Sequence, residues 1–305
     1  MENFLLGEYI KQRRLDLGLT QGEVCAGICD TITLSRLENG RQTPSRSRIK
    51  AILQRLGLPD SRYIALMSKN ELELEALKQE IESCNAFRRV DEGFEKLARL
   101  EQLAEPDDQL TRQFILRSRV VLGHAGRRYT HRQALALLEQ AIRLTSPRFD
   151  PDEVERGLYT VDEIRIISLI AITYSEMDQN RKAADLYYQL LRYIRRHLGE
   201  VSTSGEVLPG VLYNYARVLD LCGHYQEGLD YAREGKAACL RYGQYQFLPG
   251  CTAIYAECCH FLHRDAESLR CYRQAYYLYQ AFGDERNREI VEQEAWRYHS
   301  ARFED

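Results

Sequence analysis

Cysteine and histidine gather in one short stretch of the sequence, where their spacing could bind a metal ion. The stretch reads Cys258-Cys259-His260, with His263 following, so Cys259 and His263 would share one face of a helix. A zinc site would need a further ligand from elsewhere, and Cys259 falls on a repeated apolar position, which favours a buried thiol. No phosphate-binding loop, zinc-protease motif or serine-hydrolase motif is present. The sequence therefore predicts neither an enzyme nor a bound metal or other cofactor.

The cysteines and the apolar segments indicate where such a chain works. Nine cysteines, none in a Cys-x-x-Cys pair, favour reduced thiols over a disulfide framework. The first residues lack the apolar core of a signal peptide, and no stretch approaches the roughly 20 apolar residues that span a bilayer. We expect a cytoplasmic protein with no membrane partner.

Basic residues are concentrated at the N-terminal end of the chain. Residues 1–63 carry a formal charge of +3 and the remainder carries −6, for a total of −3. Guanidinium groups bind phosphate in a bidentate geometry, and this attraction is local at cellular salt. A basic head on an acidic body is therefore expected if only the head meets a polyanion.

Apolar periodicity and capping residues predict short helices in this basic head. One helix over Gln21–Ile28 begins with a capping box formed by Thr20 and Glu23. A following helix over Ile32–Glu38 ends at an Asn-Gly pair, and the next one begins after Ser45. These elements form a helix-turn-helix.

The head resembles the Xre/Cro-type helix-turn-helix family over residues 4–60. The resemblance rests on IKQRRLDLGLTQGEVCAGI followed by TLSRLENGRQTPSRSRIKAILQRLGLP, with Arg14, Leu19-Thr20-Gln21, Leu37-Glu38-Asn39-Gly40 and Pro44 in the family's order. Val24-Cys25 stands where the family usually has Leu-Ala, and the stretch from Gln21 to Glu38 is about one residue short. The resemblance implies a five-helix DNA-binding domain over residues 1–66.

The same resemblance implies where DNA would bind. The third helix would lie in the major groove, where Arg36 could chelate O6 and N7 of a guanine. Gln21, at the N-terminus of the second helix, would bond a backbone phosphate. The arginines that follow the third helix would also meet phosphates. The predicted DNA-binding residues are Gln21, Thr31, Ile32, Thr33, Arg36, Arg41, Arg46 and Arg48.

A recurring pattern organises the rest of the chain, after a charged linker helix predicted over residues 67–89. The pattern is a small residue, a bulky residue four positions later, and a small or apolar residue three positions after that. Its first positions are Ala134, Ala183, Gly228 and Ser268, which lie 49, 45 and 40 residues apart. Such periods predict paired antiparallel helices stacked as a solenoid. The repeats resemble a degenerate tetratricopeptide array.

In an array of that family, the first helix of each pair lines the concave side. The resemblance therefore implies a groove for an extended peptide. An amide such as Asn214 could bond the peptide backbone, and Arg217 could bind a carboxylate. The predicted peptide-binding residues are Arg119, Arg127, Arg165, Ser168, Ile172, Tyr213, Asn214, Arg217, Glu257, His260 and Phe261.

The combination of head and repeats is similar to the Rgg/PlcR-type quorum-sensing peptide receptors of the RRNPP group. This implies an all-α protein: a helix-turn-helix domain over 1–66, a linker helix over 67–89, and a right-handed solenoid over 90–305 that ends in a capping helix. The expected function is that of a cytoplasmic, nucleoid-associated homodimer that regulates transcription. It would bind paired half-sites of double-stranded DNA, and a short signalling peptide would change that binding.

Two alternatives remain open from the sequence. In one, the repeat domain senses a small molecule, or thiol oxidation at Cys258 or Cys259, and the head still binds DNA. In the other, the repeats are a protein-interaction scaffold that the head tethers to DNA. A response to peptide separates the main hypothesis from both alternatives.

Overall fold

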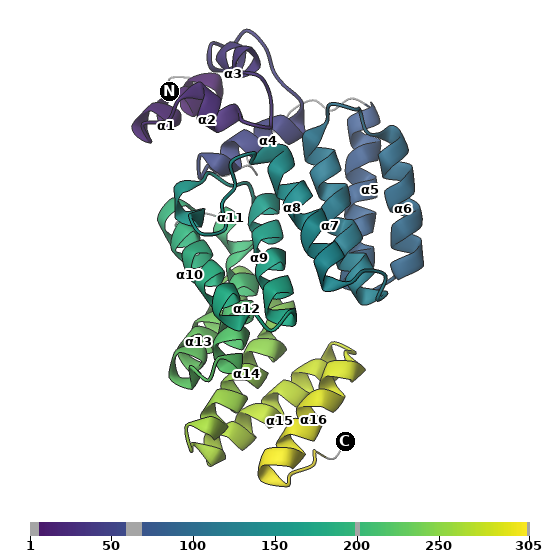
Figure 1. Ribbon diagram of the computed structural model, residues 1–305, viewed down its shortest axis with the longest axis vertical. Helices are drawn as coiled ribbons and strands as arrows, with labels where there is room; N and C mark the ends of the chain where they lie inside the picture. The colour runs from purple at the N-terminus through teal and green to yellow at the C-terminus, as the bar shows by residue number, and fades with distance from the viewer. Residues whose placement is uncertain (1–5, 59–68, 199–201, 304–305) are drawn as a thin grey trace. The chain divides into compact units, whose positions relative to one another are not determined.

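The protein is built from helices. The computed structural model describes residues 6–58, 69–198 and 202–303, and every regular element in these ranges is a helix (Figure 1). Contacts group the chain into two compact units: Met1–Thr173 with His197–Thr203, and Tyr174–Arg196 with Ser204–Asp305. The predicted all-α class, a helix-turn-helix domain followed by tetratricopeptide-like helix pairs, is confirmed.

The helices follow one another along the chain with short connections. The first part of the chain contains α1 (Leu6–Asp16), α2 (Gln21–Cys25), α3 (Thr31–Glu38), α4 (Arg46–Arg55), α5 (Lys69–Ala86), α6 (Val90–Leu103), α7 (Gln109–Ala125), α8 (His131–Thr145), the 3-10 turn η1 (Val154–Arg156) and α9 (Val161–Glu176). The second part contains α10 (Asn180–His197), α11 (Ser202–Gly205), α12 (Leu208–Leu221), α13 (Tyr225–Tyr242), the 3-10 turn η2 (Tyr245–Phe247), α14 (Leu248–Phe261), α15 (Asp265–Ala281) and α16 (Glu285–His299).

Local capping determines where α2 begins and ends. The Thr20 hydroxyl accepts the backbone N–H of Glu23 at 3.3 Å, and the Glu23 carboxylate accepts the backbone N–H of Thr20 at 2.7 Å. The helix ends at Cys25, three residues before the predicted end, because Gly27 adopts a φ of +68°.

The caps of α3 and α4 differ. The Asp30 carboxylate accepts the backbone N–H of Thr33 at 2.5 Å, which holds the first turn of α3. Ser45 stands at the N-cap of α4, as predicted, but its side chain makes no capping hydrogen bond. A fifth helix of this domain would fall within residues 59–68, which lie outside the described residues.

The helix-turn-helix domain has its own apolar core, and Gly7 allows two of its helices to approach closely. Ile10 of α1, Leu34 of α3 and Ile52 of α4 are fully buried in it. A Cβ atom added at Gly7 would lie 2.0 Å from the carbonyl oxygen of Leu37. Only a glycine allows α1 to lie this close to the end of α3.

Gly7→Ala is therefore expected to destabilise the domain. The added methyl group must displace backbone rather than a flexible side chain, and such overpacking costs about 1–3 kcal/mol. Urea unfolding followed by circular dichroism measures the loss. Gly22→Ala is the matched control, since a Cβ there lies in contact only with the Thr20 hydroxyl, at 3.9 Å. Equal stability of the two variants would contradict the predicted packing.

The repeated small and bulky positions are those at which paired helices pack. Ala183 and Ser268 are fully buried, as are the bulky Tyr187 and Tyr272 four residues later. The pairs α7–α8, α12–α13 and α14–α15 are each packed along their lengths. The sequence pattern predicted these pairs because close helix approach requires small side chains at fixed spacing.

Helix α5, predicted as a linker, packs as the partner of α6. Ile81 and Cys84 of α5 are fully buried and share a core with Leu97 and Leu100 of α6. At the other end of the chain, α16 packs on α15. No helix in the described ranges is both long and apolar enough to cross a bilayer.

Candidate nucleic-acid interface and ligand-binding residues

Three residues of the helix-turn-helix motif form one buried polar network. Arg14 of α1 binds the Glu38 carboxylate with two hydrogen bonds, at 2.6 and 2.9 Å, and donates a third to the Leu19 carbonyl at 2.9 Å. The hydrogen bond that Arg14 donates to Glu38 raises the pKa of Arg14. The Gln21 amide donates to Glu38 at 2.8 Å. The network fixes α3 against α1 and α2, and Gln21 has one amide N–H left for a phosphate.

Helix α3 presents an accessible face that runs from its first turn to Arg36 in its last turn. Thr31 and Arg36 are exposed, and Ile32 is 62% exposed. Thr33, whose backbone N–H donates to the capping Asp30 carboxylate, is half-buried. The Arg36 guanidinium makes one long hydrogen bond, 3.5 Å, to the Gln42 side chain. An exposed Ile beside an arginine suits the thymine methyl groups and guanine edges of a major groove.

Three arginines follow α3 in the next loop and at the start of α4. Arg41 and Arg46 are exposed, and Arg48 is half-buried with its guanidinium 3.8 Å from the Asp107 carboxylate. At this distance and exposure the pair contributes little stability. A phosphate could compete with Asp107 for Arg48.

A buried ion pair fastens the helix-turn-helix domain to the repeat helices of the first unit. Arg55, at the end of α4, donates to the Glu163 carboxylate of α9 at 3.1 Å and to the Thr145 carbonyl at 2.9 Å. It also donates to the carbonyls of Val24 and Ala26. The side chains of Arg55 and Glu163 are 1% and 0% exposed. One guanidinium thus joins α2, α4, α8 and α9.

The Glu163 carboxylate also accepts three hydrogen bonds from groups of the repeat helices and the turns beside them. It accepts the hydroxyls of Thr145 and Ser146 at 2.6 and 2.7 Å and the backbone N–H of Thr160 at 2.6 Å. Beside it, the Gln54 amide oxygen accepts the backbone N–H of Val161 at 3.0 Å. No local sequence pattern predicts this contact, because its partners lie 108 residues apart.

Five of the predicted peptide-binding residues lie in the first unit. Arg119 pairs with Glu101 at 2.6 Å, and Arg165 pairs with Asp162 at 3.2 Å. Arg127 is exposed in the turn after α7, with a φ of +53°. The remaining two, Ser168 and Ile172 on α9, are buried and half-buried.

The other six lie in the second unit, where they form two groups. Tyr213, Asn214 and Arg217 share α12, and the Tyr213 ring packs on Phe247 with a centroid distance of 6.0 Å. Burial raises the pKa of Tyr213. Asn214 is half-buried and Arg217 is exposed, so both can reach a ligand.

The second group surrounds Tyr298, which was not among the predicted residues. Its hydroxyl donates to the Glu257 carboxylate at 3.1 Å, and its ring stacks on His260 at a centroid distance of 4.3 Å. Phe261 stacks on Tyr225 at 4.4 Å. Helix α16 therefore brings an aromatic side chain to three predicted residues of α14.

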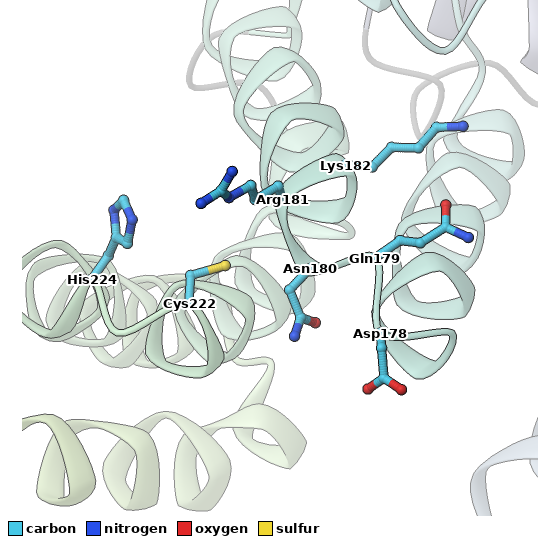
Figure 2. A pocket seen from close by; sticks show the side chains of 7 residues that line it. All are labelled: Asp178, Gln179, Asn180, Arg181, Lys182, Cys222 and His224. Atoms are coloured by element: carbon cyan, nitrogen blue, oxygen red, sulfur yellow. The ribbon is translucent and has the colours of Figure 1, made fainter.

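A hollow in the second unit is lined by other residues. It lies between the turn that leads into α10 and the turn between α12 and α13 (Figure 2). Figure 2 shows Arg181 extending toward Cys222, whereas Lys182 points the other way. None of the predicted peptide-binding residues lines this hollow. The full lining is Asp178, Gln179, Asn180, Arg181, Lys182, Cys222 and His224.

Cys258, Cys259 and His260, noted in the sequence, are engaged in ordinary contacts. All nine cysteines are free, Cys258 and Cys259 are fully buried, and burial raises the pKa of Cys259 to about 11. Such thiols carry little thiolate at neutral pH and react slowly. The His260 ring contacts Asp265, with Nδ1 and a carboxylate oxygen 3.0 Å apart. This disfavours thiol sensing through Cys258 or Cys259.

Comparison with known proteins agrees with both parts of this description. Residues 5–63 match the model of the helix-turn-helix domain family. No curated protein sequence matches the chain. Among solved structures, the fold is similar to that of Bacillus thuringiensis PlcR in complex with the peptide PapR7 and DNA. That chain is 21% identical, with 94% of this chain and 98% of that chain covered and a TM-score of 0.63.

Two further structures have the same fold. PlcR in its apo form is 19% identical over 94% of this chain and 97% of that chain, with a TM-score of 0.60. The apo form of the competence regulator ComR from Streptococcus vestibularis is 15% identical over 96% and 98%, with a TM-score of 0.53. The likeness thus covers nearly the full length of each chain.

Proposed function

We propose that this chain, a DNA-binding helix-turn-helix regulator with the fold shared by PlcR and ComR, changes its DNA binding when a short signalling peptide binds to its repeat helices. The protein acts as a homodimer whose two heads bind paired half-sites. Peptide binds one dimer arrangement more tightly than another and so shifts the population between them.

One observation carries the proposal. The chain matches, over 94% of its length, a PlcR structure that holds both a peptide and DNA. The exposed face of α3 and the arginines that follow it supply groups that can bind DNA. On the repeat helices, the half-buried Asn214 and the aromatic group around Tyr298 offer the donors, acceptors and rings that an extended peptide uses.

The test is a DNA-binding titration with the purified protein. Labelled duplexes from the promoter region beside its own gene are followed by fluorescence anisotropy at two salt concentrations, with and without the low-mass fraction of conditioned growth medium. We expect affinity for DNA to fall as the salt concentration rises, because releasing counterions from the phosphates is then less favourable. We expect a further change in affinity on adding the fraction. Specific DNA binding that no peptide fraction alters would contradict the peptide-dependent part of the proposal.

A further inference from the structure

Three acidic residues from successive repeats of the second unit meet in one cluster. Asp220 of α12, Glu257 of α14 and Glu294 of α16 recur at intervals of 37 residues and are all half-buried. The side chains of Asp220 and Glu257 lie close enough to raise the pKa of Asp220, and Glu294 lies within electrostatic range of both. We call these three residues the acidic cluster.

The acidic cluster has no basic partner in the part of the chain that the structure describes. Its hydrogen bonds come from neutral groups: the Cys258 thiol donates to Asp220 at 3.4 Å, and the Tyr298 hydroxyl donates to Glu257. The charge of the exposed Arg297 acts on Glu294 without forming an ion pair. Ionising three neighbouring half-buried carboxylates costs free energy, because they are partly desolvated and repel one another, unless a cation binds beside them.

A buried hydroxyl is also left without a partner beside the acidic cluster. Tyr272 of α15 is 0% exposed, and its hydroxyl makes no hydrogen bond. Its pKa is raised by burial and by the charges of Glu294, Glu257 and Asp220, so the hydroxyl faces the cluster. An unsatisfied buried hydroxyl costs about 1–3 kcal/mol, and a ligand group that reaches it would remove this cost.

We propose that the acidic cluster binds the positively charged nitrogen of a peptide ligand, a lysine or arginine side chain or the free N-terminus. The surrounding rings of Tyr225, Tyr272 and Tyr298 favour an organic cation over a bare metal ion, because ammonium and guanidinium groups bind well beside aromatic faces. This inference rests on the proposed function and adds that the signalling peptide carries a positive charge where it binds.

Affinity for the cation should depend on pH near neutrality. Burial and the neighbouring carboxylates raise the pKa of Asp220 and of Glu294 to about 7, from ordinary values near 4. The other titratable groups that face them are Tyr213, Tyr225, Glu257, Cys258, Tyr272, Tyr279, Arg297 and Tyr298. A cation binds the ionised carboxylates, so binding releases protons at pH 6 and not at pH 8. Affinity should fall about tenfold per titrating group from pH 8 to pH 6.

The experiment selects ligands with the full-length protein from a synthetic library of heptapeptides. Selected peptides are resynthesised with one cation neutralised at a time: lysine to norleucine, arginine to citrulline, or an acetylated N-terminus. These arms identify which nitrogen binds. We expect one such change to reduce affinity at least tenfold, and Glu294→Gln to reduce the affinity for the cationic peptide only.

A matched variant and a pH series test whether the acidic cluster itself binds the cation. Glu289→Gln removes an exposed carboxylate from the same helix and should leave the affinity unchanged. Peptides that bind equally well in their charged and neutralised forms would overturn this inference and leave the proposed function standing. If no peptide binds at all, both proposals fail together.

Discussion

Replacing Arg55 with methionine is expected to destabilise the first unit by about 3–5 kcal/mol, the usual cost of breaking a buried ion pair by removing one partner. The variant leaves the Glu163 carboxylate buried without its cation, and the carbonyls of Val24, Ala26 and Thr145 lose their donor. Urea unfolding measures the loss. Hydrogen exchange should show faster opening of α2, α4 and the start of α9.

Two further variants test the cause of that loss. Arg48→Met removes the long, partly exposed pair with Asp107 and should cost less than about 1 kcal/mol. The double variant Arg55→Met with Glu163→Leu removes both buried charges and should recover much of the stability. If Arg55→Met is no more costly than Arg48→Met, the two domains are not held by this pair.

Arg36→Ala is expected to weaken specific DNA binding by about 1–3 kcal/mol, or roughly fivefold to more than a hundredfold, while the helical fold is retained. The side chain is exposed and makes one long hydrogen bond, so its loss removes little from the folded state. The measurement compares wild type and variant on duplexes that the wild type selects from a random pool.

Arg36→Lys separates base recognition from simple charge. A lysine keeps the attraction to phosphate but cannot chelate guanine with two parallel bonds. We expect it to bind unselected DNA nearly as well as wild type and the selected duplexes much less well. Unchanged affinity of Arg36→Ala for the selected duplexes would remove α3 as the recognition helix.

Features set by neighbouring residues could be predicted from the sequence. The capping box at Thr20 and Glu23 fixes the start of α2, and small residues such as Ala183 and Ser268 mark where paired helices touch. Each of these depends on groups within one turn, or on sterics that only small side chains permit. The order of helices and the fold class follow from them.

Contacts between distant segments could not be predicted in the same way. Nothing local distinguishes Arg55 from the other arginines of the basic head, and Glu163 reads as an ordinary acidic residue in the first turn of a helix. The acidic cluster did leave a signal, the 37-residue interval, but only Glu257 was placed among the predicted binding residues. The interval alone does not show that stacking of the helices brings the three carboxylates together and partly buries them.

The network of Arg14, Gln21 and Glu38 also limits how this chain can vary among its natural relatives. Glu38 holds Arg14 through two hydrogen bonds and Gln21 through one, so losing the carboxylate leaves a buried guanidinium without its counter-charge. A neutral residue at position 38 is tolerable only if position 14 changes as well. We therefore expect positions 14, 21 and 38 to change together, whereas substitutions on the exposed face of α3 can alter which DNA is bound without disturbing the fold.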